Sequence, residues 1–323
     1  APINVMKDLS RRSFLLQTAA TSLALGAGLG AGRGADSPRR RMTIDLVCGM
    51  VGVSANQVEA IELAARHGFE SVGVDAGYLA SLSDGQASDL KGSLQAKGLV
   101  FGAAGLPVDF RRDDAKFKES LKLLPPVAAA LQRAGLDRIS TWLTPCSGSL
   151  TYLQSFRQHA TRLREVAMIL KDHNVRFGLE YVGPKTSWSS SRYPFIHTMA
   201  EMKELIAEIN TGNVGFQLDS WHWWNAGESA ADVLSLKGNE VIAVDLNDAP
   251  AGIAREQQVD NKRELPCATG VIDLASFLNA LNQIGYDGPI RAEPFNAVVN
   301  KMTKDQACAA AAASLKKAFA LVT

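Results

Sequence analysis

The feature of the sequence that most constrains its fold is a regular alternation of short, apolar, β-rich segments with amphipathic helical segments. Eight segments are expected as strands, at residues 43–50, 69–75, 99–106, 137–143, 175–181, 214–219, 240–246 and 289–294. Each is followed by a helical pattern. Eight strand–helix units in about 280 residues match the count and size of a TIM barrel. The sequence therefore predicts an α/β fold of the (β/α)8 TIM barrel class.

Residues that commonly end helices separate these units. Helices are expected at 56–67, 84–97, 115–134, 152–173, 196–209, 230–236, 274–284 and 304–321. Gly68, Gly98, Gly135 and Gly285 follow four of them, as glycine often follows a helix. A doubly wound open sheet is the main alternative. It would need a glycine-rich phosphate-binding turn after an early strand, and the sequence has no G-x-G-x-x-G there.

The N-terminal segment differs in composition from the rest. Ser10-Arg11-Arg12-Ser13-Phe14-Leu15 precedes an uncharged stretch, residues 16–32, rich in Ala, Gly and Leu. Paired arginines before a mildly apolar segment are typical of a twin-arginine export signal. A short amphipathic or disordered tail is the alternative. We expect a signal peptide and linker at residues 1–41, a barrel domain at 42–323, export to the periplasm, and no stable membrane span once the signal is removed.

Charge and cysteine content narrow the classes of partner. The 34 basic and 33 acidic side chains give a net charge of +1, so nothing favours nucleic acid or an anionic membrane as partner. The four cysteines are far apart and form no C-x-x-C pair, which argues against a zinc cluster. Buried free thiols are expected, with disulfides as the alternative that an oxidising compartment would permit. With five histidines and no basic excess, a DNA-repair endonuclease fits poorly. A small molecule is the expected partner.

Acidic residues recur near the ends of the last four predicted strands. They are Glu180, Asp219, Asp245 and Glu293. Strands five to eight are neighbours in a barrel, so these carboxylates should meet at its C-terminal mouth. Close anions repel, and a divalent ion such as Mg²⁺ or Mn²⁺ would remove that cost. Helix caps or salt bridges are the alternative roles. Asp248 is expected to be a loop or capping residue rather than a ligand.

Other candidates lie in the loops that follow strands. His222, three residues after Asp219, is a candidate for substrate contact, metal ligation or packing. Trp142 is a candidate for stacking on a sugar, with core packing as the alternative. Two long loops, 183–194 and 249–271, carry the basic candidates Lys185 and Arg263. Either side chain could anchor a substrate hydroxyl, carboxylate or phosphate, or could simply be solvated.

At these residues the chain resembles the xylose-isomerase-like barrel superfamily of sugar isomerases and epimerases. The resemblance rests on Leu179-Glu180, Leu218-Asp219-x-x-His222, Asn247-Asp248, Arg263-x-x-Pro266 leading to Gly270-Val271-Ile272-Asp273, and Glu293-Pro294-Phe295. It implies one divalent ion, Mn²⁺ or Mg²⁺ first and Zn²⁺ or Co²⁺ next, held by Glu180, Asp219, Asp245 and Glu293. Asp245 stands where the ketose 3-epimerases of the superfamily have histidine. His222 and Arg263 match the residues that contact substrate there.

The resemblance also implies a reaction. Glu180 and Glu293 would serve as base and acid in proton abstraction beside a carbonyl of a sugar or polyol, through an enediolate. Return of the proton gives an epimer or an isomer, and loss of a β-substituent makes the chain a dehydratase or lyase, as in the related inosose dehydratases. Hydrolase or lyase action on keto-sugars, and a non-catalytic carbohydrate-binding barrel, are the alternatives. Homo-oligomers are common in the superfamily.

Overall fold

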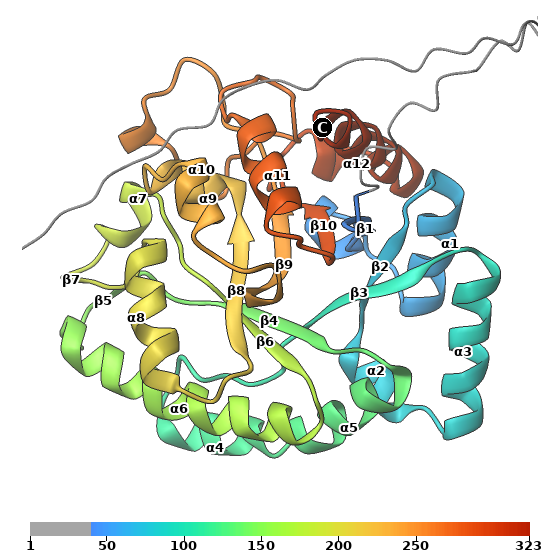
Figure 1. Cartoon of the computed structure of the whole chain (residues 1–323), viewed down its shortest axis with the longest axis horizontal. Helices are drawn as coiled ribbons and strands as arrows, with labels where there is room; N and C mark the ends of the chain where they lie inside the picture. Colours follow the sequence, from blue (N-terminus) through green and yellow to red (C-terminus); the bar gives the residue numbers. More distant parts are fainter. Residues whose placement is uncertain (1–39) are drawn as a thin grey trace, which may run out of the picture. The chain divides into compact units, whose positions relative to one another are not determined.

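Eight parallel strands close into a barrel in the order β1-β10-β9-β8-β6-β4-β3-β2 in the computed structural model, which describes residues 40–323. Helices surround the strands (Figure 1). The predicted TIM barrel is confirmed. The predicted twin-arginine segment lies outside the described residues.

Every barrel strand lies inside a predicted one. The strands are β1 (Thr43–Leu46), β2 (Ser71–Val74), β3 (Val100–Gly105), β4 (Arg138–Trp142), β6 (Arg176–Glu180), β8 (Val214–Asp219), β9 (Val241–Leu246) and β10 (Pro289–Ala292). The first predicted strand, 43–50, is too long. The chain turns into the 3-10 helix η1 (Cys48–Val51), which ends at Gly52 with a φ of 74°, a conformation that favours glycine.

The long helices form the outer layer. They are α1 (Gln57–His67), α3 (Asp84–Ala96), α4 (Asp114–Leu121), α5 (Leu124–Ala134), α6 (Tyr152–Asp172), α8 (Met199–Ile209), α11 (Leu274–Gln283) and α12 (Lys304–Phe319). The single helix predicted at 115–134 is wrong, because α4 and α5 are separate helices. Pro125 and Pro126 have no backbone N–H to donate, so they fit the first turn of α5 but would interrupt a longer helix.

Short helices complete the connections. They are α2 (Ala76–Ser81), α7 (Lys185–Trp188), α9 (Ser220–Asn225) and α10 (Ala230–Leu234), with η2 (Gly238–Glu240), η3 (Arg255–Gln257) and η4 (Val299–Lys301). The sequence patterns indicated only α10 among these helices. Short helices are hard to predict because they span too few residues to show a helical period.

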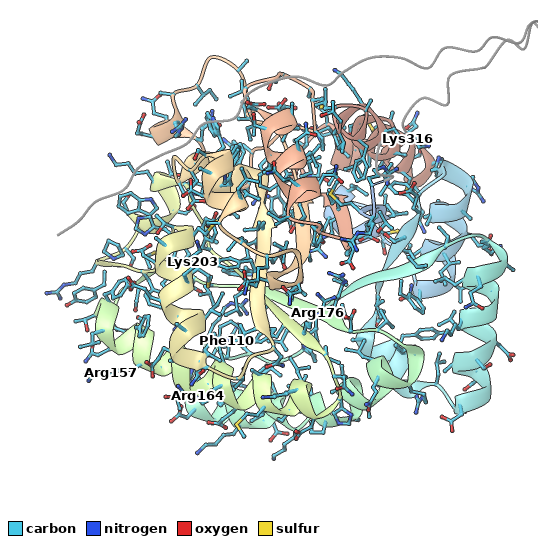
Figure 2. The ribbon with its side chains drawn as sticks, in the orientation of Figure 1. Phe110, Arg157, Arg164, Arg176, Lys203 and Lys316 are labelled. Atoms are coloured by element: carbon cyan, nitrogen blue, oxygen red, sulfur yellow. The ribbon has the colours of Figure 1, made fainter. Side chains whose placement is uncertain are left out.

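Apolar side chains fill the space between the barrel and its helices. All six residues of β9 are buried, as expected of a strand covered on both faces. Figure 2 shows Phe110 inside the ring of helices, whereas Arg157 points outward from α6. Burial of this apolar layer holds the barrel rigid and thereby positions the strand ends.

Two long loops cover the C-terminal mouth of the barrel. The loop after β6 contains α7 and the strand β7 (Tyr193–Pro194), which pairs antiparallel with β5 (Cys146–Ser147). The loop after β9 is tied down by Asp248, whose carboxylate accepts the backbone N–H groups of Ala249, Thr269, Gly270 and Ile272 at 2.7–3.1 Å. Asp248 therefore organises a loop, as predicted.

Two further expectations concern the membrane and the cysteines. Within residues 40–323, no helix combines the length and the apolar composition needed to span a bilayer. Cys48, Cys146, Cys267 and Cys308 are free thiols in this structure. Cys48 and Cys308 are buried, and the other two are partly exposed.

Candidate functional site

Four carboxylates from neighbouring strands meet at the C-terminal mouth. Glu180 ends β6, Asp219 ends β8, Asp245 lies near the end of β9, and Glu293 follows β10. Glu180, Asp245 and Glu293 each place one carboxylate oxygen within 4.8 Å of the others, and Glu180 does so with Asp219 and His222. The barrel therefore brings together the acidic residues that the sequence singled out.

Asp219 is fixed by hydrogen bonds from three directions. It is fully buried, and its Oδ1 accepts the backbone N–H of Trp221 at 2.8 Å and Asn247 Nδ2 at 3.0 Å. Its Oδ2 accepts Arg263 Nη1 at 2.7 Å. The first of these bonds caps α9, the short helix that carries His222.

Arg263 reaches this cluster from the loop after β9. Its guanidinium donates to Asp219, to Glu293 Oε2 at 3.1 Å and to Asp260 Oδ1 at 2.8 Å. It also stacks on Phe295 at 4.7 Å from the ring centre. The three carboxylates raise the pKa of Arg263, although burial opposes this. Arg263 is thus a permanent cation inside the site, largely engaged by protein carboxylates.

Asp245 is already paired on both of its oxygens. Arg291 Nε donates to Oδ1 at 2.6 Å, and Gln217 Nε2 donates to Oδ2 at 2.7 Å. Arg291 on β10 and Asp245 on β9 are register partners, which explains the close pair. Glu180 differs, because its Oε1 is buried and has no hydrogen-bond partner among residues 40–323. A buried carboxylate oxygen without a donor is costly, and a cation would satisfy it.

The carboxylates perturb one another's proton affinity. Burial, with repulsion from its neighbours, raises the pKa of Glu180 well above the usual value for glutamate. Burial raises the pKa of Asp219 to about 7 even against the opposing effect of Arg263. Burial and Asp245 raise the pKa of Glu293 to about 8. Perturbations of this size are typical of functional sites.

His222 is a buried, neutral histidine beside the carboxylates. Its Nδ1 accepts the backbone N–H of Gly183 at 3.2 Å, so in the neutral ring Nε2 carries the proton and is a donor; Arg263 Nη2 lies 3.4 Å from Nε2. Burial, with repulsion from Arg263, lowers the pKa of His222 to about 3. Its Nε2 is 3.9 Å from Glu180 Oε1. The ring is therefore placed to hydrogen-bond a group bound at Glu180.

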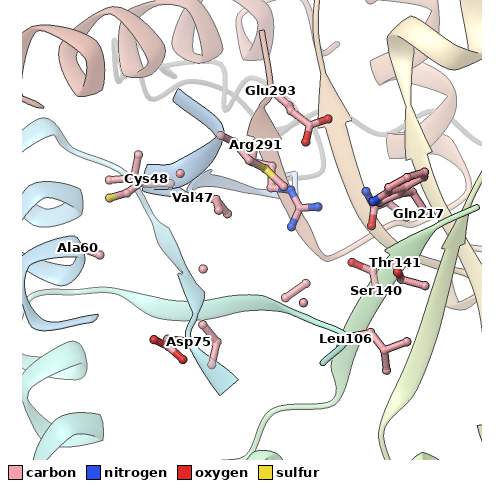
Figure 3. A pocket seen from close by; sticks show the side chains of 18 of the residues that line it. Val47, Cys48, Ala60, Asp75, Leu106, Ser140, Thr141, Gln217, Arg291 and Glu293 are labelled. Atoms are coloured by element: carbon pink, nitrogen blue, oxygen red, sulfur yellow. The ribbon is translucent and has the colours of Figure 1, made fainter. Parts of the chain in front are cut away.

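Two cavities flank the carboxylates and share Trp142, Glu180 and Glu293 in their walls. The inner cavity, of 460 Å³, extends toward β1 and β2 (Figure 3). In that view Arg291 and Glu293 come from the β10 side and Thr141 from β4. The loop cavity, of 500 Å³, lies under the loop after β6 and is also lined by His222 and Arg263. Both volumes suit small organic ligands.

Of the two remaining residues that the sequence singled out, one lies at the site and the other does not. Trp142 is 48% exposed and lines both cavities. Lys185, by contrast, is exposed at the start of α7 and lines neither of these cavities, so the structure does not bring it to the site.

Sequence reasoning missed Arg291, Gln217 and Arg111, which line the inner cavity. Arg291 could have been found, because it stands two residues before Glu293, and side chains two apart in a strand share a face. Gln217 bears the same relation to Asp219. Arg111 carries no such signal, since neighbouring Arg112 has the same charge and points to solvent.

The model of the xylose isomerase-like TIM barrel family matches residues 61–318. The solved structure of a xylose isomerase domain protein from Alicyclobacillus acidocaldarius is 32% identical, with a TM-score of 0.76, over 87% of this chain and 99% of that chain. The solved IOLI protein with a bound zinc atom is 20% identical, with a TM-score of 0.72, over 87% of this chain and 99% of that chain, a likeness of fold alone.

A curated inosose isomerase of Bacillus subtilis is 28% identical over 149 residues, which are 45% of this chain. The match covers 49% of that relative, so the chain spans about half the length of the curated relative that it matches. The extent of the family match, together with the closed barrel and its ring of acidic residues, shows that this chain belongs to the xylose isomerase-like TIM barrel family.

Proposed function

We propose that this protein is a sugar isomerase or epimerase that depends on a divalent metal and removes a proton from carbon beside a carbonyl. The observation that carries the proposal is the cluster of Glu180, Asp219, Asp245 and Glu293 at the mouth of the barrel, between two ligand-sized cavities. The inosose isomerases among its relatives support a sugar or polyol as substrate.

The donor atoms fit a hard divalent cation. Glu180, Asp219 and Glu293 would hold it, because carboxylate oxygens suit Mg²⁺ and Mn²⁺, and Glu180 Oε1 lacks a donor. Zn²⁺ is the ion described for one protein of the same fold. Asp245 could join as a further ligand, because each of its oxygens keeps a second lone pair beside the bond from Arg291 or Gln217. When bound, the ion supplies Lewis-acid polarisation of a substrate carbonyl.

Glu180 and Glu293 would move the proton. Both residues line both cavities, and both carboxyls have a raised pKa. The pKa of Glu293, about 8, is close enough to neutrality for this carboxyl to take and return a proton, and the raised pKa of Glu180 makes its carboxylate a stronger base. His222, Trp142 and Arg263 would orient the substrate by a hydrogen bond, by ring stacking and by charge.

The proposal is tested by incubation with ketoses and inososes in deuterated water with Mn²⁺ added. Incorporation of deuterium at the carbon beside the carbonyl, read by NMR or mass spectrometry, is the expected result. Glu180→Gln and Glu293→Gln should each lower the exchange rate at least about a hundredfold, as loss of a positioned acid or base does. Glu256→Gln, an exposed change in the loop after β9, is the control.

Full exchange in either Gln variant would remove that glutamate from the mechanism. Tight binding of sugars without any exchange would instead support a non-catalytic carbohydrate-binding barrel.

A second candidate is lyase or hydrolase action on keto-sugars that carry a second group, such as keto-glycosides. The two cavities favour it, since one could hold the keto-sugar and the other the departing group, with Glu180 and Glu293 between them. Release of a free alcohol or sugar from a 3-keto-glucoside, followed by chromatography, identifies this reaction. Deuterium exchange with no bond cleavage supports the isomerase.

We also propose that the chain is exported by the twin-arginine route, on the pattern around Arg11 and Arg12. Replacement of both by lysine should leave the protein in the cytoplasmic fraction of an expressing bacterium. Unchanged export of that variant would exclude this route.

A further inference from the structure

Arg111 is a charged side chain in the wall of the inner cavity, in the loop between β3 and α4. Its Nη2 donates to Thr141 Oγ1 at 2.8 Å and to the carbonyl oxygen of Trp142. The guanidinium stacks on the rings of Phe110 and Trp142, 4.4 and 4.2 Å from their centres. These contacts hold the plane of the guanidinium in one orientation at the end of β4.

Among the described residues, Arg111 has no ion-pair partner, unlike the other two arginines of the site. Arg263 pairs with Asp219 at 2.7 Å and Arg291 pairs with Asp245 at 2.6 Å. The nearby Asp109 pairs instead with Arg112 at 3.2 Å. In addition, Arg111 Nε is buried without an acceptor.

The charge of Arg111 persists at neutral pH. Burial lowers the pKa of Arg111 to about 10, and Asp109 and Glu180 oppose that effect. A partly buried cation without a counter-ion is unfavourable, so an anion from outside the chain would stabilise it. Because both protons of Nη2 are donated to Thr141 and Trp142 and Nε is buried, Nη1 is the nitrogen left to donate to an anionic oxygen, such as that of a carboxylate.

The cavity wall places this cation and the proposed acid–base pair around one space. Arg111, Glu180 and Glu293 all line the inner cavity. Building on the proposed function, we propose that the substrate is a sugar acid, whose carboxylate binds Arg111 while its carbonyl end lies at Glu180 and Glu293. A phosphorylated sugar suits the space less well, because Arg291 is occupied by Asp245 and a dianion would find one free guanidinium.

The test compares binding of matched probes to the full chain with Mn²⁺ present, by calorimetry. D-galacturonate is paired with D-galactose, D-glucuronate with D-glucose, and glucose 6-phosphate is a third arm. Each uronate should bind at least about tenfold more tightly than its neutral partner, the gain expected from a charged hydrogen-bonded pair. Arg111→Gln should bring the ratio of affinities close to one, and Arg111→Lys should retain part of it.

Arg112→Gln is the matched control, since Arg112 is adjacent and its side chain is 71% exposed. It should keep the wild-type ratio. A general disturbance of the fold by Arg111→Gln would weaken both members of a pair alike, so the ratio isolates the charge. Four results would each overturn the proposal. The wild type could bind a uronate and its neutral partner equally, or the ratio of these affinities could be unchanged in Arg111→Gln. Glucose 6-phosphate could bind more tightly than the uronates, or neither uronate could bind.

The proposed function and this inference fail in different ways. Deuterium exchange on neutral ketoses, combined with no preference for uronates, would leave the isomerase standing and remove the role of Arg111. A preference for uronates that depends on Arg111, without deuterium exchange on any substrate, would support the role of Arg111 and contradict the proposed isomerase.

Discussion

Arg263 Nη1 lies 2.7 Å from Asp219 Oδ2, although 44 residues separate the two in the chain. Both side chains are almost completely buried, at 2% and 0% exposure. The pair joins the loop after β9 to the end of β8. The loop is therefore part of the wall of the site.

Arg263→Ala should destabilise the protein strongly. The change leaves the carboxylates of Asp219, Asp260 and Glu293 without their cation, and removal of one partner from a buried ion pair costs about 3–5 kcal/mol. Urea denaturation in the presence of a chelator measures the loss. Lys262→Ala, an adjacent exposed change, should alter the free energy of unfolding by less than about 0.5 kcal/mol. Equal stability of the two variants would show that the ion pairs contribute little.

Removal of a bound divalent ion should lower the melting temperature. A ligand held only by the folded state stabilises it by about 2.7 kcal/mol when present at a hundred times its Kd. Metal-free protein, prepared with a chelator, should regain its melting temperature on addition of Mn²⁺ or Zn²⁺, with about one ion per chain by elemental analysis. In Glu180→Gln the rise in melting temperature on addition of the metal should be smaller than in the wild type. A melting temperature indifferent to every divalent ion would argue against the metal site.

His159 should make the protein sensitive to acid. Burial among Phe110 and Phe195 lowers its pKa from 6.5 to about 4. Between these two values His159 is protonated in the unfolded chain but not in the folded chain, so the contribution of His159 to stability falls as pH drops from 6.5 to 4. The carboxyls of Asp219 and Glu293, whose pKa is raised, change stability in the opposite sense, so the effect of His159 is read by comparison with a variant that lacks it. The integrated effect is about 3 kcal/mol.

His159→Phe should reduce this loss by a similar amount, measured by urea denaturation across the pH range and compared with wild type. Phe277→Leu truncates a buried ring that packs on Trp223 rather than on His159, so it should lower stability equally at every pH. An identical pH dependence in His159→Phe and the wild type would refute the assignment.

Gly183→Ala should displace His222. A Cβ at Gly183 would overlap the carbonyl oxygen of His222, and Gly183 also donates its N–H to the His222 ring. We expect a fall in kcat/KM of at least about tenfold, since small misplacements of site groups are costly. Gly85→Ala is the matched control, because a Cβ there meets nothing within 4 Å and alanine favours the helix. Equal kinetics in the two variants would show that close approach of the backbone at Gly183 is not needed.

Much of the fold could be predicted because its signals are local. The apolar run that ends at Asp219 gave β8 with its observed bounds, and Asn56 was correctly placed at the start of α1, where its side chain caps the helix. The prediction of one helix across Pro125 and Pro126 is wrong because the apolar residues there keep a helical period, whereas the two prolines cannot donate a backbone hydrogen bond inside a helix. Closure of the barrel followed from the number of units.

The sequence by itself determined that Glu180, Asp219, Asp245 and Glu293 would meet, because each stands at the end of an apolar run and parallel strands in a barrel end at one face. Only the tertiary structure decided which of these charges is already neutralised. Asp245 pairs with Arg291, Arg263 joins three carboxylates, and Lys185 is exposed to solvent. Arg111 forms no ion pair with any residue that the structure describes, and its Nε has no acceptor there. Such ion pairs depend on the register between neighbouring strands and on the position at which a long loop packs against the barrel. Neither can be predicted from the local pattern of residues.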